Sequence, residues 1–323
     1  MPISVTAHGR VNLIGDHTDY TGGLVLPMLL ECRTEIVGER IDEPLWLLRS
    51  DAEPEPARIE LPAKVPTNDT PHWARYPAGV LAVLAANDIE IAGFRGSVTT
   101  TIPIGGGLSS SAALEVAVAR VAIGDRAVDP TTLATWCREA EHLASGVPCG
   151  IMDQLVIAAG TPGQALLIDC RSLATSPVSL PADVDVEVRF VAPRTLAGSE
   201  YADRVADCRA IEQIIGPLRD AEPAAIDGLA DERLRRRARH VISENRRVLE
   251  FVAAVAADDV ETAGRLMTAS HESLGADYQT SNPVMDRAVS EMLAEPGVLG
   301  ARMTGGGFGG CVVALRRRAS GKR

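Results

Sequence analysis

The sequence predicts an α+β protein of two domains. Its 323 residues reach the size at which a single hydrophobic core stops growing, so a pair of domains of about 150 residues is expected. β-branched segments are frequent in the first half, and long segments with helical spacing dominate the second half. The change falls near residue 165. We therefore expect one domain over residues 1–164 and another over residues 165–323.

The elements of the first domain follow from the spacing of apolar residues and from the positions of turn residues. Short β-branched segments between turns indicate strands, and apolar residues at helical spacing indicate helices. In chain order we expect strands within 3–40 and at 46–48, a helix at 73–86, a strand at 95–102, and helices at 109–123, 133–145 and 151–159.

The second domain is expected to be richer in helix. The same criteria predict strands at 165–170 and 184–192, helices at 199–215, 229–256, 258–274 and 285–293, and closing strands at 298–303 and 311–315. No internal repeat or low-complexity linker separates these elements.

The charge balance of the chain is acidic, with a formal net charge of −11 and a pI of about 5.1. Such a chain is poorly suited to coat nucleic acid or an anionic membrane, although a local site can still bind a small anion. The basic run Arg233–Arg239 follows two acidic residues on an expected helix, which favours a solvated, ion-paired face. We expect small molecules as partners, and neither nucleic acid nor membrane.

The N-terminal segment and the cysteines indicate a cytoplasmic protein. No apolar run reaches the roughly 18 residues that a membrane span needs, and the first residues lack the pattern of a secretory signal. The six cysteines form no C-x-x-C pair and the histidines show no H-x-x-x-H spacing. A zinc site is therefore unsupported, and free thiols are expected.

The two lysines of the chain, Lys64 and Lys322, exclude two common ways of binding ATP. Neither is followed by Ser or Thr, so the G-x-x-x-x-G-K-[ST] P-loop is absent. Lys64 lies in a proline-rich stretch rather than on a strand behind a glycine-rich loop, where a protein kinase would need it.

The first segment whose residues suit binding or catalysis is 96–123. It is expected to form a strand, a glycine-rich loop and a helix. The glycines at 105–107 leave no Cβ to keep a ligand from the backbone, and three serines at 109–111 begin the helix. Free N–H groups, the positive helix end and hydroxyls suit an anion, and a hydroxyl there can also bind Mg²⁺. For any single serine an N-cap is the alternative, but the whole run GGGLSSSAALE favours phosphate binding.

A second glycine-rich loop, Thr304–Gly310, contains the G-x-G-x-x-G pattern. Only 13 residues follow Gly310, too few for the helix, strand and acidic residue of a dinucleotide-binding fold, so that interpretation is rejected. Two interpretations stay open: a tight turn between two strands, or a loop packed beside the phosphate site.

Ionisable residues are concentrated in the segment His8–Pro27. Arg10, Asp16, His17 and Asp19 fall within ten residues of one another. Carboxylates and imidazole in this spacing suit hydrogen bonding to a polyol, and an arginine could bind phosphate or orient a carboxylate. Alone, the segment would also fit a solvated hairpin.

A further candidate segment, 141–154, contains Glu141, His142 and Asp153. Taken alone, Asp153 at a helix start is interpreted as a cap, and His142 as a surface or satisfied helix histidine.

Together, these segments resemble the galactokinase family of the GHMP sugar and metabolite kinase superfamily. Four stretches in the family's order carry the resemblance: GRVNLIGDHTDYTGGLVLPM (9–28), IPIGGGLSSSAALEVA (102–117), AEHLASGVPCGIMDQ (140–154) and TGGGFGGCVVAL (304–315). The resemblance implies the GHMP kinase fold, with two α+β domains and an active site in the cleft between them. It also implies a ribosomal-protein-S5-like unit with a left-handed βαβ crossover in the first domain, against the usual right-handed rule.

The resemblance implies roles for individual residues. Asp153 matches the acid proposed to take the proton from the anomeric hydroxyl of the sugar, and Arg10 matches the arginine that holds this acid. The family's sugar-binding positions fall at Asp16, His17, Asp19, Gly150 and Tyr201, and its Mg²⁺ ligands at Ser111 and Glu141. Its nucleotide-binding positions fall at Trp73, Gly105, Gly106, Gly107, Leu108, Ser109 and Ser110. Met303–Gly310 match a third motif that supports the site.

The implied activity is ATP-dependent phosphorylation of D-galactose to α-D-galactose 1-phosphate, with Mg²⁺ as cofactor, by a monomer or weak homo-oligomer. Two alternatives stay open: a kinase of another sugar, such as N-acetylgalactosamine or L-arabinose, and a sensor that binds sugar and ATP without catalysis. The family's usual Glu in G-E-H-T-D-Y is Asp16 here, one methylene shorter, which bears on the choice of sugar.

Overall fold

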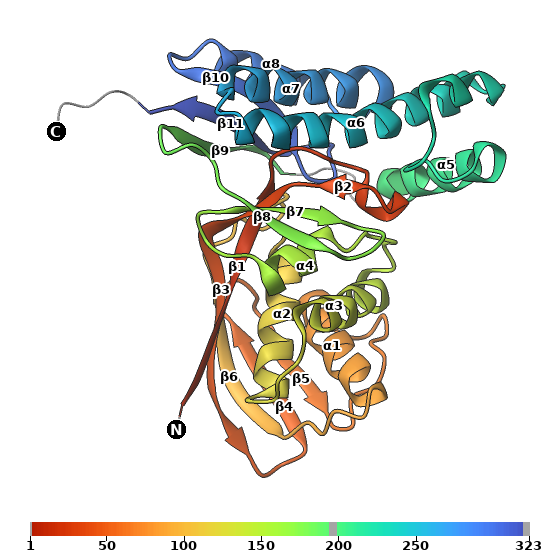
Figure 1. Ribbon diagram of the computed structural model, residues 1–323. Helices are drawn as coiled ribbons and strands as arrows, with labels where there is room; N and C mark the ends of the chain where they lie inside the picture. The colour runs from red at the N-terminus through yellow and green to blue at the C-terminus, as the bar shows by residue number, and fades with distance from the viewer. Residues whose placement is uncertain (1, 194–198, 319–323) are drawn as a thin grey trace. The chain divides into compact units, whose positions relative to one another are not determined.

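The computed structural model describes residues 2–193 and 199–318, and the chain divides into two compact units (Figure 1). Unit 1 comprises Met1–Arg10, Leu29–Pro103 and Ser109–Pro162, and unit 2 comprises Val11–Met28, Ile104–Leu108 and Gly163–Arg323. We expected a single boundary after residue 164. The main boundary lies two residues earlier, and two shorter N-terminal segments group with unit 2.

Unit 1 contains a sheet in which buried side chains of neighbouring strands pack against one another. Strand β1 pairs with β3, β3 pairs antiparallel with β6, β6 pairs parallel with β4, and β4 pairs antiparallel with β5. Trp46 of β4 and Phe94 of β6 are direct partners in register, and their ring centroids lie 4.9 Å apart. The bounds are β1 (Ile3–Asn12), β3 (Pro27–Ile41), β4 (Leu45–Ser50), β5 (Ala57–Glu60) and β6 (Gly93–Thr100).

Four helices of unit 1 pack against one another beside this sheet (Figure 1). They are α1 (Arg75–Ala86), α2 (Ser110–Ile123), α3 (Pro130–Ser145) and α4 (Met152–Ala159), and the turn η2 (His72–Ala74) precedes α1. All four expected helices are confirmed, although α3 begins three residues earlier than expected. Its start is set by Asp129, whose carboxylate accepts the N–H groups of Thr131 and Thr132 while Pro130 occupies the first turn.

Unit 2 contains two groups of strands. Strand β2 (Leu24–Val25) pairs antiparallel with β7 (Ala165–Asp169), which pairs antiparallel with β8 (Thr175–Val178). A separate antiparallel sheet has the order β10-β11-β9, with β9 at Val184–Ala192, β10 at Val298–Thr304 and β11 at Gly310–Arg317. Sequence reasoning missed β8, a short and mostly exposed strand that contains Pro177.

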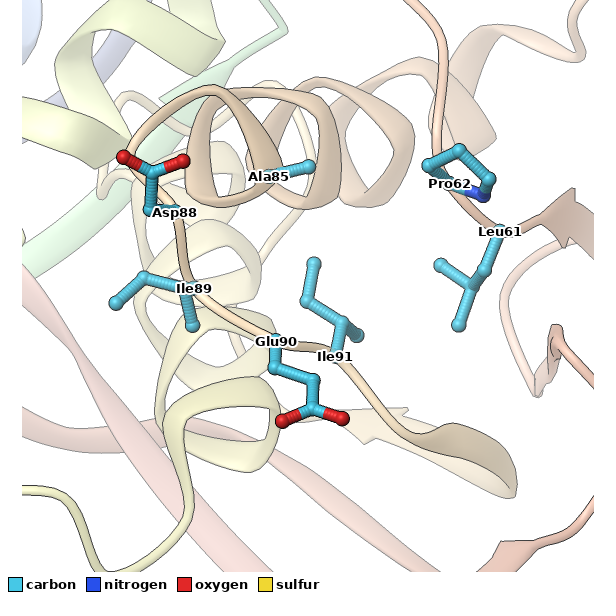
Figure 2. A pocket seen from close by; sticks show the side chains of 7 residues that line it. All are labelled: Leu61, Pro62, Ala85, Asp88, Ile89, Glu90 and Ile91. Atoms are coloured by element: carbon cyan, nitrogen blue, oxygen red, sulfur yellow. The ribbon is translucent and has the colours of Figure 1, made fainter.

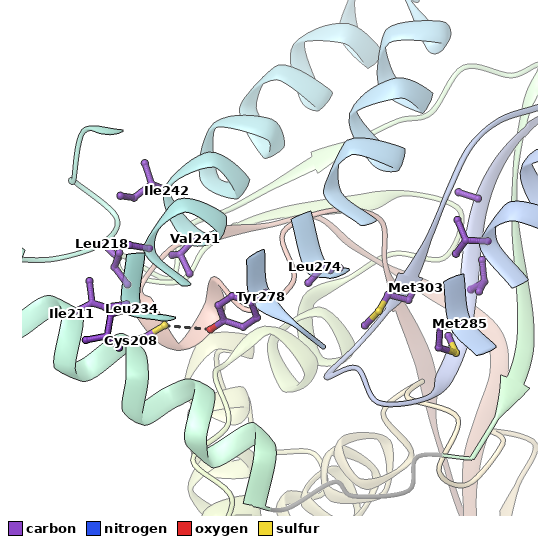
Figure 3. Close-up of a cluster of buried hydrophobic side chains, with 14 of the residues drawn as sticks. Cys208, Ile211, Leu218, Leu234, Val241, Ile242, Leu274, Tyr278, Met285 and Met303 are labelled. Carbon is purple, nitrogen blue, oxygen red and sulfur yellow. Dashed lines mark hydrogen bonds between the residues drawn. The ribbon is translucent and has the colours of Figure 1, made fainter. Parts of the chain in front are cut away.

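The helices of unit 2 enclose a core of apolar side chains (Figure 3). Helix α7 runs directly into a π-helical turn, η4, whose last residue Tyr278 is fully buried. The bounds are η1 (Asp19–Thr21), α5 (Ser199–Ile215), η3 (Pro223–Gly228), α6 (Glu232–Ala256), α7 (Val260–Ser273), η4 (Leu274–Tyr278) and α8 (Pro283–Leu293). Across the residues described, no helix combines the length and apolar character needed to cross a membrane.

A surface cavity of about 440 Å³ in unit 1 lies apart from every residue to which the sequence assigned a role. Its lining, shown in Figure 2, is Leu61, Pro62, Ala85, Asp88, Ile89, Glu90 and Ile91. The two charged side chains of this lining are both acidic, which makes the cavity unsuitable for a phosphate.

Candidate active site

In unit 1, Arg10 and Asp153 form a bidentate ion pair. Arg10 lies on β1 and Asp153 in the first turn of α4; Nε donates to Oδ1 and Nη2 to Oδ2, each at 2.7 Å. The hydroxyl of Ser109 also donates to Asp153 Oδ2. A planar fork of this kind fixes the orientation of the carboxylate. The Asp153 side chain remains 28 % exposed, so a ligand can still reach it.

Ser109 does not cap α2 with its side chain. It occupies the N-cap position in a left-handed conformation, with φ 64°, but makes no side-chain cap hydrogen bond there. Its hydroxyl binds Asp153 instead. The N-cap alternative therefore does not apply to Ser109, and the first N–H groups of α2 are left to other acceptors.

Glu141 and Ser111 lie side by side in unit 1, on α3 and α2. The Ser111 hydroxyl hydrogen-bonds the Glu141 carboxylate, and Glu115, one helical turn after Ser111, hydrogen-bonds Glu141 as well. Gln154 Nε2 donates to Glu115 Oε2 at 3.0 Å. Burial, and then the neighbouring charge of Glu141, raise the pKa of Glu115 far above its usual range. Glu115 is therefore the protonated partner and donates to Glu141.

Sequence reasoning missed Glu115. Its spacing of four residues from Ser111 places both on one face of α2, and this is the signal that could have found it.

A hydroxyl beside a carboxylate is a set of hard oxygen donors that Mg²⁺ accepts. Among the residues described, no group of three or more His, Cys, Asp and Glu side chains could hold a metal by itself. A metal at Ser111 and Glu141 would thus take its other ligands from water or from a substrate, as Mg²⁺ commonly does in kinases. Burial also raises the pKa of Glu141, and a cation beside it would offset the cost of its buried charge.

The residues matched to nucleotide binding are divided between the units. Ile104–Leu108 belong to unit 2, whereas Ser109 and Ser110 begin the helical segment of unit 1. Gly105 has φ +73°, and a Cβ built there would meet no heavy atom within 4 Å, so its backbone is open to a ligand. Trp73 lies on η2 in unit 1, is 7 % exposed, and donates its indole N–H to the Glu55 carbonyl at 2.9 Å.

In unit 2, the Asp16 carboxylate is surrounded by protein donors. Asn12 Nδ2 donates to Oδ1 at 2.6 Å, and Oδ2 accepts from Arg302 Nη2 at 2.6 Å and from the Gly305 N–H at 3.1 Å. Arg302 lies on β10, and Gly305 begins the second glycine-rich loop. Through the Gly305 N–H, that loop helps to hold the carboxylate of Asp16, a contact that neither a tight turn nor a loop packed beside the phosphate site describes.

The structure brings together two residues matched to sugar binding, His17 and Tyr201. Their ring centroids lie 5.6 Å apart, with Tyr201 on α5. His17 has φ +65° and accepts or donates a hydrogen bond at Nδ1 with the Tyr20 hydroxyl, at 3.0 Å. Asp19 begins η1, two residues further on. Gly150, the remaining sugar-binding position, lies in unit 1 and is buried three residues before Asp153.

Helix α6 supports the loop between β1 and β2 through buried polar side chains. Glu244 Oε1 accepts the Gly15 N–H at 2.9 Å, and Asn245 Oδ1 accepts the Leu24 N–H at 2.8 Å. His240 Nε2 donates to the Asp16 carbonyl at 3.1 Å. Gly15 itself is required there, because it has φ +97° and a Cβ would lie 2.6 Å from the Leu24 carbonyl oxygen.

The electrostatics of α6 favour this arrangement at neutral pH. Burial lowers the pKa of His240 to about 4, so the imidazole is neutral. Burial alone would raise the pKa of Glu244, but the neighbouring groups, with the Arg247 guanidinium the largest contributor, together outweigh it and the pKa falls to about 2. Sequence reasoning missed both residues; the signal was polar residues at helical spacing among the apolar residues of one helix face, which also contains Arg237 and Asn245.

Family models match three parts of the chain. The model for the GHMP kinases N terminal domain matches residues 75–161, and the model for the GHMP kinases C terminal matches residues 251–322. The galactokinase galactose-binding signature matches residues 1–40, which include Arg10 and the Asp16–Asp19 segment. The fold and these matches define the class of the protein as a GHMP kinase.

Known proteins narrow this class further. The chain is 44 % identical to galactokinase of Homo sapiens over 330 residues, covering 97 % of this chain and 83 % of the human protein. It is 40 % identical to galactokinase of Chloroflexus aurantiacus over 322 residues, covering 96 % and 82 %. The crystal structure of Lactococcus lactis galactokinase complexed with galactose matches with a TM-score of 0.92 at 32 % identity, covering 98 % and 86 %. The chain belongs to the galactokinase family.

Proposed function

We propose that this protein transfers the γ-phosphoryl group of ATP to the anomeric hydroxyl of D-galactose, giving α-D-galactose 1-phosphate. Membership of the galactokinase family and the galactose-binding signature over residues 1–40 support galactose as the substrate. The observation that carries the chemistry is the bidentate Arg10–Asp153 pair, in which a fixed carboxylate remains partly exposed.

Asp153 is the group that receives the hydrogen bond of the attacking hydroxyl. In a loose phosphoryl-transfer transition state, placement of the nucleophile contributes as much as removal of its proton. Arg10 fixes the plane of the carboxylate and brings a permanent positive charge to the site of transfer, where charge on the phosphoryl oxygens must be stabilised.

The other sugar hydroxyls are assigned to His17, Asp19 and Tyr201 of unit 2 and to the backbone at Gly150 of unit 1. His17 and Tyr201 support this assignment by their ring contact. Asp16 contributes to sugar binding mainly through the loop that it anchors, because its two oxygens already accept three protein hydrogen bonds.

ATP is bound by the backbone of Gly105–Leu108, by Ser109 and Ser110 at the start of α2, and by Trp73 beside the base. The N–H groups at the start of a helix suit the phosphates, and the open backbone at Gly105 lets them approach closely. Ser111 and Glu141 hold Mg²⁺, which supplies positive charge to the phosphates.

The test is ADP release by the purified protein with Mg-ATP and a panel of D-galactose, N-acetylgalactosamine, L-arabinose and D-glucose. Turnover on galactose supports the proposal, and turnover on another sugar alone overturns the assignment of galactose. Binding of galactose and ATP without turnover identifies a sensor.

A pair of variants tests the role of Asp153. Asp153→Asn should lower kcat by about 10²-fold to 10⁴-fold while galactose still binds. Asp129→Asn makes the same substitution at the cap of α3, outside the site, and should leave kcat unchanged.

A further inference from the structure

A line of hydrogen bonds in unit 2 ends on the ring of His17. It starts at the buried thiol of Cys208 on α5, whose Sγ lies 3.2 Å from the Tyr278 hydroxyl, as the dashed line in Figure 3 shows. The Tyr278 hydroxyl lies 2.6 Å from the Tyr20 hydroxyl, and the Tyr20 hydroxyl lies 3.0 Å from His17 Nδ1. Cys208 and Tyr278, which lie outside every motif, and Tyr20, to which no role was assigned, are thus linked to a residue matched to sugar binding.

The chemistry of the groups gives this line a direction. Each hydroxyl has one proton to donate, and burial raises the pKa of Cys208 to about 12, so the thiol keeps its proton. An imidazole nitrogen is the best acceptor in the line, whereas sulfur is the weakest. The favoured order is therefore donation from Cys208 to Tyr278, from Tyr278 to Tyr20, and from Tyr20 to His17 Nδ1.

The ring and the backbone of Tyr278 are both held in place by neighbouring residues, which keeps its hydroxyl within this line of hydrogen bonds. Its ring packs against two histidines, with centroids 4.7 Å from His17 and 4.6 Å from His240. It ends a π-helical turn, a feature that often marks functional positions. Arg237 Nη1 donates to the Asp277 carbonyl at 2.6 Å, and Arg204 Nε donates to the Tyr278 carbonyl at 3.0 Å, so the backbone of the turn is fixed on both sides.

We propose that Tyr278, acting through the hydroxyl of Tyr20, is a positioning residue that fixes the tautomer of His17. With Nδ1 accepting from Tyr20, a neutral imidazole carries its proton on Nε2. Nε2 then offers a hydrogen-bond donor to a sugar oxygen in a fixed orientation. The link to sugar binding rests on the proposed function, whereas the tautomer itself does not depend on it.

The first test is Tyr278→Phe, which keeps the ring and removes only the oxygen. The KM for galactose should rise about threefold to tenfold, the effect of one lost hydrogen bond, while the KM for ATP and kcat stay within about twofold. Tyr20→Phe should have an effect at least as large. The double variant should be no worse than Tyr20→Phe alone, because one break already interrupts the line. Additive effects in the double variant would overturn the proposal.

The outer end of the line gives a matched control. Cys208→Ser keeps a donor for Tyr278 and should preserve the KM for galactose, whereas Cys208→Ala should raise it. Cys137→Ala removes another fully buried thiol, on α3 of unit 1, and should leave the KM for galactose unchanged. Equal effects of Cys208→Ala and Cys137→Ala on this KM would assign Cys208 to packing alone and overturn the inferred line.

The second test reads the tautomer directly by ¹⁵N NMR of the histidine rings in protein without sugar. The ring signals of His17 are identified by their absence from the spectrum of His17→Gln. In the wild type they should show the proton on Nε2, and in Tyr278→Phe they should show a mixture of the two tautomers. A wild-type His17 protonated on Nδ1 would overturn the proposal. If the wild-type protein neither binds nor phosphorylates galactose, the proposed function fails, but this measurement still decides on the tautomer.

Discussion

Arg302 Nη2 lies 2.6 Å from Asp16 Oδ2, and the two side chains are only 0 % and 2 % exposed. The pair joins β10 to the loop between β1 and β2, 286 residues apart in the chain. A buried ion pair adds little stability over an apolar replacement, but the loss of one partner leaves a charge without compensation. In this protein the loss of Arg302 would leave the charge of Asp16 uncompensated, in the loop between β1 and β2.

Arg302→Met should therefore destabilise the protein by about 3–5 kcal/mol, measured as the free energy of unfolding in urea. The matched control is Arg171→Met, which breaks the exposed pair with Asp220, whose side chains are 50 % and 59 % exposed. Arg171→Met should lower the free energy of unfolding by only about 0–1 kcal/mol. Equal costs for the two variants would contradict a special role for the buried pair.

A second prediction concerns the geometry of the Arg10–Asp153 pair. Arg10→Lys keeps the positive charge but loses the planar fork that binds both carboxylate oxygens. Because a small misplacement of the reacting groups is costly, kcat should fall by about 10²-fold. Steady-state kinetics measure this, with thermal unfolding to show that the variant is folded. A kcat within about threefold of the wild type would mean that charge alone is sufficient.

The segments that carry the candidate site could be predicted because their signals are local in sequence. The glycine-serine run at 105–111 and the ionisable residues at 10–19 stand out by composition and spacing. The resemblance then assigned roles that spacing could not give, such as that of Asp153. Its pairing with Arg10 is now seen, whereas its role in proton transfer and the left-handed crossover stay predictions.

The support of the site could not be predicted, because it depends on contacts between distant elements. Nothing local to α6 indicates that Glu244 and Asn245 bind backbone N–H groups more than 200 residues earlier. The same contacts help to explain why Val11–Met28 group with unit 2, against the expected division of the chain after residue 164. Tertiary contacts, rather than the order of the segments in the sequence, decide to which unit a segment belongs.

A third prediction follows from the protonated state of Glu115. Glu115→Gln replaces a neutral acid by a neutral amide of similar shape that can still accept from Gln154 and donate to Glu141. The free energy of unfolding should change by less than about 1 kcal/mol. Glu115→Leu leaves both partners without their hydrogen bonds and should cost about 1–3 kcal/mol or more. Urea unfolding compares the two, and a loss for Gln as large as the loss for Leu would contradict a neutral Glu115.

The last prediction concerns the pH dependence of stability through His240. Burial holds the pKa of His240 at about 4, below about 6.5 in an unfolded chain, so the unfolded state binds the proton more readily. The neutral ring contributes its stability fully above about pH 6.5, and this contribution falls as the pH drops towards 4, by about 3 kcal/mol in total. Glu244 nearby has a pKa of about 2, so its own contribution is lost only below about pH 4.3.

His240→Gln should remove most of this slope, because Gln can still donate to the Asp16 carbonyl and accept from Ser273 without titrating. The measurement is the free energy of unfolding in urea between about pH 7.5 and 4.5 for both proteins. Burial also lowers the pKa of His271, which adds a slope of the same sign to both, so the difference between the two proteins isolates His240. His72→Gln, at an exposed histidine, is the control and should keep the wild-type slope. Parallel curves for wild type and His240→Gln would show that His240 can take up a proton in the folded protein at no cost, against the burial seen in the structure.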